Sequence, residues 1–317
     1  MRDLLLARAQ LLERIRQYFA ETGVLEVSTP VLSFCANTDP AIESFATAYR
    51  AAGASQDAQP MYLHTSPEFF MKRLLCAGSG SIYQIAPVFR NGEAGRLHNP
   101  EFSLLEWYRL DFDQHALMQD VQQLLMSLLP QPVEVDRFSY QELFERHLGI
   151  NPHLAELGEL HALAESQHIS VTSHIELSKE DWLELLFNQV IEAQFDQQRL
   201  TFVYDYPASQ ASLARIRDDD EAPVAERFEL YFQGVELANG FHELQHADEQ
   251  LLRFQQDNRK RQQRGQQALP IDMQLIAALR GGLPDCSGVA LGLDRLLMIL
   301  LGESQLDEVL AFPLNEV

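Results

Sequence analysis

The sequence predicts an α+β fold in which an antiparallel sheet is flanked by helices. Two pairs of strand-like segments, 81–89 with 101–108 and 227–232 with 234–244, are rich in β-branched, aromatic and aliphatic residues. A loop or a short turn that contains glycine joins each pair, which is typical of hairpins. Residues 5–19 carry apolar side chains at spacings of three and four, and this pattern predicts an amphipathic helix.

Composition narrows the class of protein. The chain has 317 residues, of which 46% are hydrophobic, so we expect a large globular core. No apolar run approaches the ~18 residues of a membrane span, and the first residues do not form a signal peptide. We therefore expect no membrane partner.

Charge and cysteine usage narrow the class further. The net charge of −22 disfavours stable tRNA binding, because nucleic-acid affinity depends largely on lysine and arginine. The three widely spaced cysteines, Cys35, Cys76 and Cys286, are typical of reduced thiols in a cytoplasmic protein.

The loop between the first two strands is the most informative stretch. It carries Arg90, Arg96 and His98 beside two glutamates, and Phe102 follows on the return strand. Arginine forks suit phosphate oxygens, and an aromatic ring can stack on a base. These residues indicate a nucleotide site, although a solvated hairpin with scattered charges is the alternative interpretation of this stretch alone.

Further elements follow in chain order. Ser66 is expected to cap a helix, with Pro67 in its first turn and Glu68 at the positive end of its dipole. Residues 110–200 predict a helical insertion, with helices at 119–129 and 179–195. Residues 200–207 predict a strand, 215–221 a charged loop, and 248–264 and 271–279 helices.

Four glutamates lie on predicted strands that otherwise favour apolar residues: Glu106, Glu229, Glu236 and Glu243. Buried carboxylates are costly unless they are paired or bind cations. The spacing of Glu229, Glu236 and Glu243 does not show whether they share a face of the sheet, because a turn at Gln233-Gly234 lies between Glu229 and Glu236. Exposed strand carboxylates are the alternative interpretation.

The motifs F-R-N-x-E at 89–93, R-x-H-N-P-E-F at 96–102 and L-E-W-Y at 105–108 resemble motif 2 of class II aminoacyl-tRNA synthetases in its lysyl form. They resemble more closely the lysyl-tRNA synthetase paralogues that modify elongation factor P. The helix and strand at the start of the chain resemble motif 1, which builds the class II dimer interface, and residues 288–301 resemble motif 3.

The resemblance implies a class II catalytic domain over residues 1–317, a homodimer, and no anticodon-binding domain. It implies catalytic roles for Arg90 and Arg295. It implies ATP-binding roles for Arg90, Asn91, Gly92, Asn99, Phe102, Glu236, Leu237, Gly292 and Arg295. Glu229 and Glu236 would hold Mg²⁺ on the ATP phosphates. The implied amino-acid site consists of Ser66, Pro67, Glu68, Glu106, Tyr108, Asn239, Glu243 and Ala290.

Such an acidic pocket suits an amino acid with two ammonium groups, because a neutral amino acid would leave carboxylates unpaired. The resemblance implies ATP-dependent activation of (R)-β-lysine and its transfer to a lysine side chain of elongation factor P. A lysyl-tRNA synthetase and a catalytically inactive binding paralogue are the alternatives.

Two positions depart from the lysyl-tRNA synthetase pattern. Gly92 stands where motif 2 usually has an acid, and Glu93 follows one place later. Ala290 stands where lysyl-tRNA synthetases resemble one another in having glycine, a difference that the elongation-factor-P ligases share. We expect the extra methyl group of Ala290 to reshape the amino-acid pocket.

Overall fold

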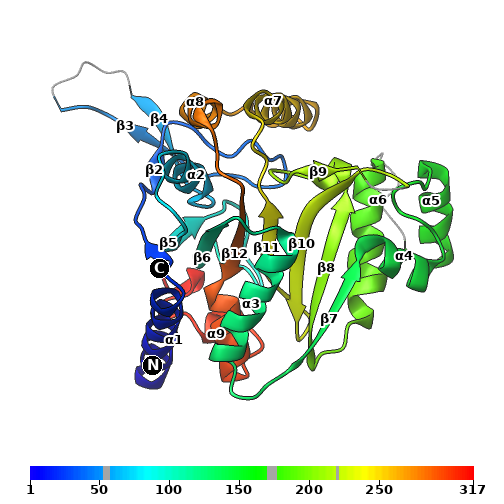
Figure 1. Cartoon of the computed structure of the whole chain (residues 1–317), viewed down its shortest axis with the longest axis horizontal. Helices are drawn as coiled ribbons and strands as arrows, with labels where there is room; N and C mark the ends of the chain where they lie inside the picture. The colour runs from blue at the N-terminus through cyan, green and yellow to red at the C-terminus, as the bar shows by residue number, and fades with distance from the viewer. Residues whose placement is uncertain (53–57, 170–176, 219–220) are drawn as a thin grey trace. The chain divides into compact units, whose positions relative to one another are not determined.

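The computed structural model describes residues 1–52, 58–169, 177–218 and 221–317. The chain forms two compact units (Figure 1). We call Met1–Gln131 with Glu243–Val317 the terminal unit, and Pro132–His242 the central unit. Among the described residues, no helix combines the length and the apolar composition that crossing a bilayer requires.

The terminal unit contains the predicted loop-bearing hairpin. Its main strands are β1 (Leu25–Glu26), β5 (Ile82–Phe89), β6 (Glu101–Leu110) and β12 (Cys286–Gly292). Strand β6 pairs antiparallel with β5 on one side and β12 on the other, whereas β1 pairs parallel with β5. The predicted antiparallel arrangement is therefore confirmed for these central strands, with one parallel pair at the edge.

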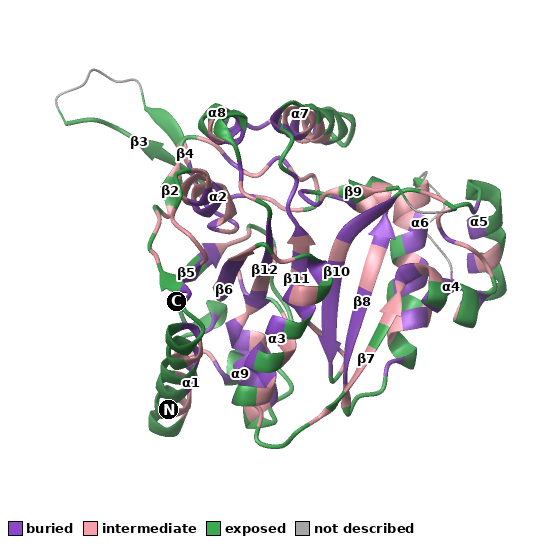
Figure 2. Cartoon of the chain, viewed as in Figure 1, coloured by how far each residue is buried: buried purple, intermediate pink, exposed green. Residues whose placement is uncertain are grey.

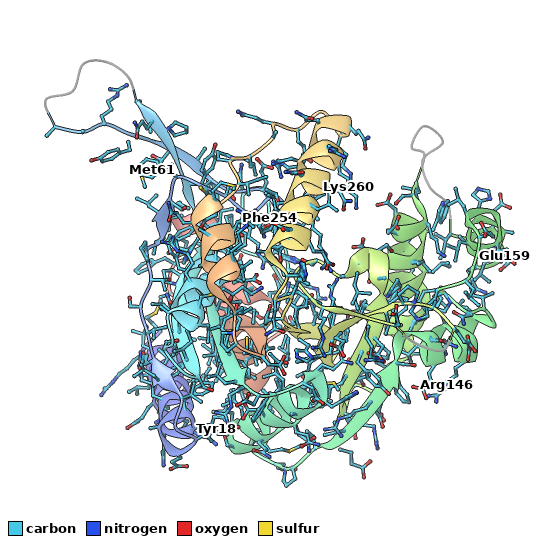
Figure 3. The ribbon with its side chains drawn as sticks, turned by 45° about the horizontal axis from the view of Figure 1, so that its top comes forward. Tyr18, Met61, Arg146, Glu159, Phe254 and Lys260 are labelled. Carbon is cyan, nitrogen blue, oxygen red and sulfur yellow. The ribbon has the colours of Figure 1, made fainter. Side chains whose placement is uncertain are left out.

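Helices α1 (Arg2–Glu21) and α3 (Gln114–Leu128) pack against one face of β5 and β6. Phe19 of α1 stacks on Tyr83 with ring centroids 4.2 Å apart, and the Trp107 indole donates to Asp120 of α3 at 3.0 Å. Tyr18 (Figure 3) also donates to Asp120, at 2.6 Å. Most of β5 and β6 is buried as a result (Figure 2).

Alternate residues of these strands face the other way, toward α2 (Glu68–Cys76). Helices α7 (Ala247–Gln263) and α8 (Met273–Gly281) complete this side, and Phe254 of α7 (Figure 3) packs on Phe69 of α2 with centroids 5.4 Å apart. The remaining elements of the unit are β2 (Leu32–Ser33), β3 (Ala46–Tyr49), β4 (Gln59–Leu63), α9 (Leu293–Leu301), η4 (Leu306–Glu308) and η5 (Leu314–Glu316).

The central unit has its own strands and helices. The strands are β7 (Glu134–Ser139), β8 (Arg199–Pro207), β9 (Ile216–Arg217), β10 (Val224–Phe232) and β11 (Val235–His242). All pairs are antiparallel except β7 with β8. The helical elements are α4 (Tyr140–Leu148), α5 (Leu157–Ser166), α6 (Lys179–Leu186), η1 (Phe187–Ile191), η2 (Glu192–Gln194) and η3 (Ala208–Gln210). Tyr140 stacks on Phe144 and Phe187 in the core of this unit.

Several boundaries differ from the sequence prediction. Helix α3 starts earlier than 119, because the Asp113 carboxylate caps it by accepting the Ala116 N–H at 2.8 Å. The predicted insertion at 110–200 also contains a strand, β7. Within the segment 215–221, predicted as a charged loop, Ile216 and Arg217 form β9; residues 219–220 lie outside the described part.

Candidate active site

The first group of site residues surrounds the start of α2. The Ser66 hydroxyl accepts the Glu68 N–H at 3.0 Å and donates to Glu106 Oε2 at 2.6 Å. The helix begins at Glu68 with Pro67 at its N-cap position, one residue later than predicted. The predicted capping hydroxyl is therefore shared with a carboxylate of β6, which brings Ser66, Glu68 and Glu106 together.

Glu106 is buried and accepts two hydroxyl hydrogen bonds. Besides Ser66, the Tyr108 hydroxyl donates to its Oε1 at 2.8 Å. Burial, and then repulsion by Glu68, raise the pKa of Glu106 to about 8, although both hydroxyl contacts favour the charged form. This carboxyl group is therefore mostly protonated near neutral pH.

Lys72 supplies a cation that the sequence prediction missed. Its Nζ lies 2.7 Å from Glu68 Oε1 and 2.6 Å from Glu243 Oε2, and only 1% of the residue is exposed. Burial alone would lower the pKa of Lys72, but the charges of Glu243 and Glu68 outweigh it and hold that pKa above its usual value. The spacing from Glu68 to Lys72, four residues on one helix, was the available sequence signal.

The charges of this group do not balance. Glu68, Glu106 and Glu243 face one ammonium, that of Lys72, so the cluster has a formal charge of −2 when all groups are ionised. Burial raises the pKa of Glu243, while the neighbouring Lys72 opposes that rise. When ionised, the cluster therefore has an excess of negative charge, which favours a cationic partner.

Strand β12 lies beside the carboxylate cluster. A Cβ atom at Gly288 would lie 2.3 Å from Tyr108 Cε1 and 2.6 Å from Glu243 Oε1, so only glycine leaves room for both side chains. Ala290 pairs in register with Glu106 and therefore shares its face of the sheet. The structure thus brings Ala290 to the carboxylate cluster.

The hairpin loop holds the predicted nucleotide residues. The Arg90 guanidinium lies over the Phe102 ring, 5.1 Å from its centroid, and Arg90 Nη1 lies 3.8 Å from Glu93 Oε1. Gly92 has φ +84°, a conformation that favours glycine, while the backbone N–H of Asn91 donates to Glu43 at 2.8 Å. Glycine at position 92 thus meets a backbone requirement, and the displaced acid still lies near Arg90.

Arg295, near the start of α9, contacts the same loop. Its Nε donates to the Leu97 carbonyl at 3.2 Å, and its Nη2 lies 2.9 Å from His98 Nε2. Burial, and then the charge of Arg295, lower the pKa of His98, so the neutral ring can accept from the guanidinium. Gly292 immediately precedes α9.

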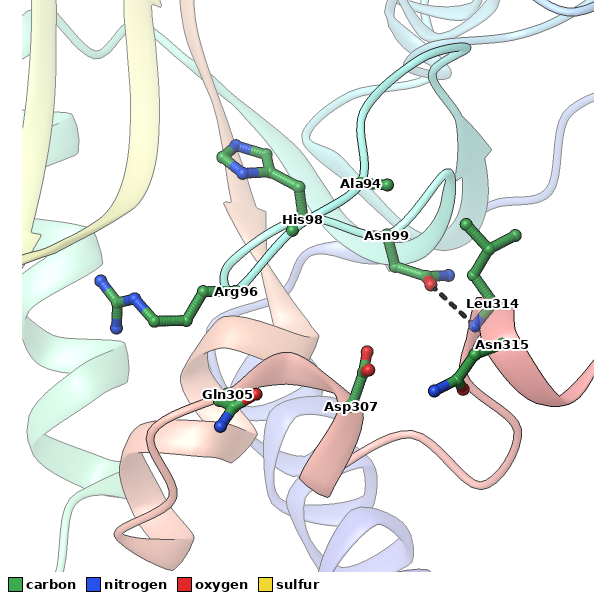
Figure 4. A pocket seen from close by; sticks show the side chains of 9 residues that line it. Ala94, Arg96, His98, Asn99, Gln305, Asp307, Leu314 and Asn315 are labelled. Carbon is green, nitrogen blue, oxygen red and sulfur yellow. Dashed lines mark hydrogen bonds between the residues drawn. The ribbon is translucent and has the colours of Figure 1, made fainter.

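The side chain of Asn99 links the hairpin loop to the segment at Leu314. Its amide nitrogen donates to the Glu101 carbonyl at 2.6 Å, and its Oδ1 accepts the Leu314 N–H at 3.2 Å (Figure 4). A cavity of about 300 Å³ lies beside it, lined by Ala94, Gly95, Arg96, His98, Asn99, Gln305, Asp307, Leu314 and Asn315. Both ends of the Asn99 amide are therefore engaged by the protein itself.

The central unit holds a second polar group around Glu229. The Tyr206 and Tyr231 hydroxyls donate to Glu229 Oε2 at 2.7 and 2.5 Å, and Arg227 donates to Oε1. Burial opposes the charge of Arg227, but Glu229 outweighs it and keeps the arginine pKa above its usual value. Sequence reasoning missed Arg227, although residues two apart on a strand share a face.

The predicted partners of Glu229 lie on β11. Asn239 pairs with Glu229 and Glu236 pairs with Tyr231, and a register shift between Leu230 and Tyr231 brings both pairs to one face. Asn239 Oδ1 is buried without a hydrogen-bond partner among the described residues, whereas Leu237 packs as a buried apolar side chain. In the described ranges, no three His, Cys, Asp or Glu side chains gather as a ready-made metal site.

These motifs and this geometry define a class of protein. The chain belongs to the class II tRNA synthetases, since residues 1–316 match the family described as tRNA synthetases class II (D, K and N). It is 51% identical over 311 residues to the "Elongation factor P--(R)-beta-lysine ligase" of Yersinia enterocolitica. The matched region covers 98% of this chain and 95% of that protein. Proteins of the same name from Yersinia pestis and Yersinia pseudotuberculosis are 50% identical over the same coverage. The family resemblance predicted from the motifs is confirmed.

Proposed function

We propose that this protein is an AMP-forming ligase that activates (R)-β-lysine with ATP and transfers it to a lysine side chain of elongation factor P. The observation that carries this proposal is the buried cluster of Glu68, Glu106 and Glu243 around the single cation of Lys72. The names of relatives that share about half of its residues support the same activity.

The charge of the cluster selects the substrate class. A neutral amino acid brings one ammonium to a cluster whose formal charge is −2 when ionised, so one buried carboxyl group would stay protonated or without a partner. A diamino acid supplies two ammonium groups and matches the cluster. Lysine and β-lysine both satisfy this condition, and Ala290 beside Glu106 supports β-lysine.

The reaction then proceeds in two steps. A carboxylate oxygen of the amino acid attacks the α-phosphorus of ATP, and pyrophosphate leaves, so a mixed anhydride with AMP forms. The ε-amine of the acceptor lysine next attacks the activated carbonyl, AMP leaves, and the attacking nitrogen loses a proton. No protein nucleophile is needed, because positioning and charge neutralisation lower the barrier.

The nucleotide residues are assigned as follows. Arg90 neutralises charge on the α-phosphate, Arg295 binds the γ-phosphate, and Phe102 packs against the adenine. Their geometry supports these assignments, because Arg90 lies on the Phe102 ring and Arg295 reaches the same loop through Leu97. Backbone groups at Asn91, Gly92 and Gly292 and the side chain of Asn99 complete the proposed nucleotide site of the terminal unit. The ATP contact of Leu237, in the central unit, stays a prediction.

Magnesium is part of the proposal, with Glu236 and Glu229 as its ligands. Glu236 and Glu229 would hold the ion, which would supply positive charge to the phosphates and usually takes only one or two protein carboxylates. Glu236 is half-buried and shares a face with Glu229, which fits this role. Both oxygens of Glu229 contact Arg227 and two tyrosines, so Glu229 joins the ion only if Arg227 turns away.

The partners proposed are a second copy of the chain and elongation factor P in the cytoplasm, without stable tRNA binding. Exposed apolar side chains in the motif 1 segment support the homodimer: Leu5 and Leu6 are each 49% exposed and Leu25 is 58% exposed.

Amino-acid-dependent pyrophosphate exchange into ATP tests the activation step. We expect exchange with β-lysine, weaker exchange with lysine, and none with alanine or leucine. Arg90→Ala should lower the rate by roughly 10²–10³-fold, as is typical for one preorganised charge-stabilising donor. Arg259→Ala, a change at an exposed arginine of α7, serves as the control. Equal exchange with neutral amino acids would overturn the assignment, and no exchange at all would indicate a binding paralogue.

A further inference from the structure

Arg8, Ser103 and Asp294 form a closed hydrogen-bonded network inside the terminal unit. Arg8 Nη1 donates to Asp294 Oδ1 at 2.5 Å, and Arg8 Nη2 donates to the Ser103 hydroxyl at 2.5 Å. The backbone N–H of Ser103 donates to Asp294 Oδ2 at 2.6 Å. Each of the three residues contacts the other two, so this Arg8 network joins α1, β6 and α9, and α1 and α9 lie side by side (Figure 1).

The Asp294 carboxylate takes over from a strand at this point of the sheet. Strand β12 pairs with β6 only as far as Gly292 and Leu104, and the chain then turns into α9. The next residue of β6, Ser103, lies beyond the end of β12, and its N–H bonds Asp294 instead. Only 2% of Asp294 is exposed, and Arg8 supplies the positive charge that a buried carboxylate needs.

The network is one residue away from two side chains that we assign to ATP. Ser103 follows Phe102, and successive residues of a strand point to opposite faces, so holding the Ser103 backbone fixes where the Phe102 ring projects. Asp294 precedes Arg295 in the first turn of α9. One carboxylate bonded to both segments therefore sets the spacing between the adenine contact and the γ-phosphate arginine.

We propose that Arg8 is a positioning residue for ATP, which holds Ser103 and Asp294 together and thereby keeps Phe102 and Arg295 at a fixed separation. The inference rests on the proposed function, since it takes Phe102 and Arg295 as nucleotide contacts. Arg8 acts through these residues and not on ATP itself. A guanidinium suits this role because its planar fork bonds two partners in one fixed geometry, which a single ammonium does not.

The contacts of Arg295 with the hairpin loop do not replace this support. Its Nε donates to the Leu97 carbonyl, and its Nη2 lies beside His98 Nε2. A γ-phosphate would compete for the same guanidinium donors. The Arg8 network holds α9 and the backbone of β6 independently of that guanidinium, so both segments stay in place while the Arg295 side chain changes partners.

Nucleotide binding separates positioning from folding. The Kd values for ATP and for ADP, each with magnesium, are measured by titration calorimetry for wild type, Arg8→Met, Arg295→Ala and the double variant. Because ADP lacks the γ-phosphate, the ratio of the Kd for ADP to the Kd for ATP reports the contribution of Arg295. We expect Arg8→Met to lower this ratio roughly 10-fold, as is typical when a hydrogen bond to a charged group is lost. A role in folding alone would lower the Tm and leave the ratio unchanged.

The double variant tests whether Arg8 acts through Arg295. Arg295→Ala should bring the ratio of the two Kd values close to unity. Adding Arg8→Met should then change the ratio little, because residues that act as one unit have non-additive effects.

A matched control and a second Arg8 variant keep the test decisive. Arg16→Met changes another ion-paired arginine of α1, whose partner Glu26 is also exposed, and should leave both Kd values unchanged. Arg8→Lys keeps a positive charge beside Asp294 and serves if Arg8→Met does not fold. Because an ammonium lacks the fork, Arg8→Lys should lower the ratio by less than Arg8→Met does.

An unchanged ratio in folded Arg8→Met and Arg8→Lys would overturn the proposal. An equally large fall on adding Arg8→Met to Arg295→Ala would also overturn it, because the two residues would then act independently. Wild-type exchange with β-lysine would keep the proposed function in either case. Absence of that exchange would remove the proposed function, whereas the ratio of the two Kd values would still test Arg8.

Discussion

Lys72 and Glu243 form a buried ion pair, with Nζ and Oε2 2.6 Å apart and side chains that are 2% and 1% exposed. The pair joins α2 to the segment that follows β11, and Glu68 completes it from within α2 at 2.7 Å. The cluster therefore carries its own cation, and Lys72 compensates one of the three formal negative charges of Glu68, Glu106 and Glu243.

Lys72→Met should destabilise the protein strongly. Among the described residues, the Lys72 ammonium is the only one in contact with Glu68 and Glu243, so the change leaves both buried carboxylates without their cation. Breaking a buried ion pair in this way costs about 3–5 kcal/mol. Urea unfolding measures the loss. Lys260→Met, a change at an exposed lysine of α7 (Figure 3), should shift stability by less than about 0.5 kcal/mol. Equal stabilities for the two variants would contradict a structural role for the pair.

Gly288→Ala should disrupt the pocket although it adds a single methyl group. The new Cβ would lie 2.3 Å from Tyr108 and 2.6 Å from Glu243, so one of these side chains must move. We expect a cost of about 1–3 kcal/mol from overpacking, and a larger relative loss of β-lysine exchange than of ATP affinity. Gly281→Ala has no atom within 4 Å of its Cβ and is the matched control. Wild-type exchange by Gly288→Ala would mean that Tyr108 and Glu243 do not need their observed positions.

The raised pKa of Glu106 predicts a pH dependence of stability. In the folded protein this pKa is about 8 rather than 4.5, because of burial and repulsion by Glu68. Between these values the folded state holds a proton that the unfolded chain has released, so the free energy of unfolding falls as pH rises from about 4.5 to about 8. Below this window the free energy of unfolding no longer depends on this group, because both states are protonated and its stabilising contribution is fully present; above about 8 that contribution is lost.

Unfolding measured across that pH window tests this prediction. Glu106→Gln should flatten the slope by up to about 1.4 kcal/mol per pH unit, whereas Glu303→Gln, at an exposed glutamate, should not. An unaltered slope in Glu106→Gln would show that another group binds the proton.

Ala290→Gly should relax the preference for β-lysine. Ala290 lies in register with Glu106, where its methyl group occupies volume that glycine would leave open. One methyl group in a pocket typically changes the discrimination between two substrates by about 1–3 kcal/mol, or roughly 10–200-fold. The ratio of kcat/KM for β-lysine and lysine should move toward lysine in the variant. A constant ratio in a folded variant would reduce Ala290 to a packing residue.

The elements with strong local patterns were predictable from the sequence. Residues 81–108 alternate as strands around a loop with Gly92 and Pro100, and they form β5 and β6. The strand and helix of motif 3 are likewise confirmed as β12 and α9. The motifs also predicted the family, and the residues around Ser66, Glu68, Glu106 and Tyr108 meet in one cluster.

The cations that pair with the site carboxylates were not predictable with the same ease. Lys72 follows Glu68 by one helical turn, a spacing that usually marks a solvated surface pair, and only packing against Glu243 buries it. Arg227 is two residues from Glu229, and the same carboxylate also accepts hydrogen bonds from Tyr206 and Tyr231, of which Tyr206 comes from another strand. Burial of a charged side chain is a tertiary property that local patterns do not encode.

The most direct test of the central claim is the mass of the product. The protein is incubated with ATP, magnesium and either (R)-β-lysine or lysine, together with elongation factor P or tRNA. We expect elongation factor P to gain the mass of one β-lysyl group on a lysine side chain, less product with lysine, and uncharged tRNA. Charged tRNA with unmodified elongation factor P would contradict the account and identify a tRNA synthetase instead.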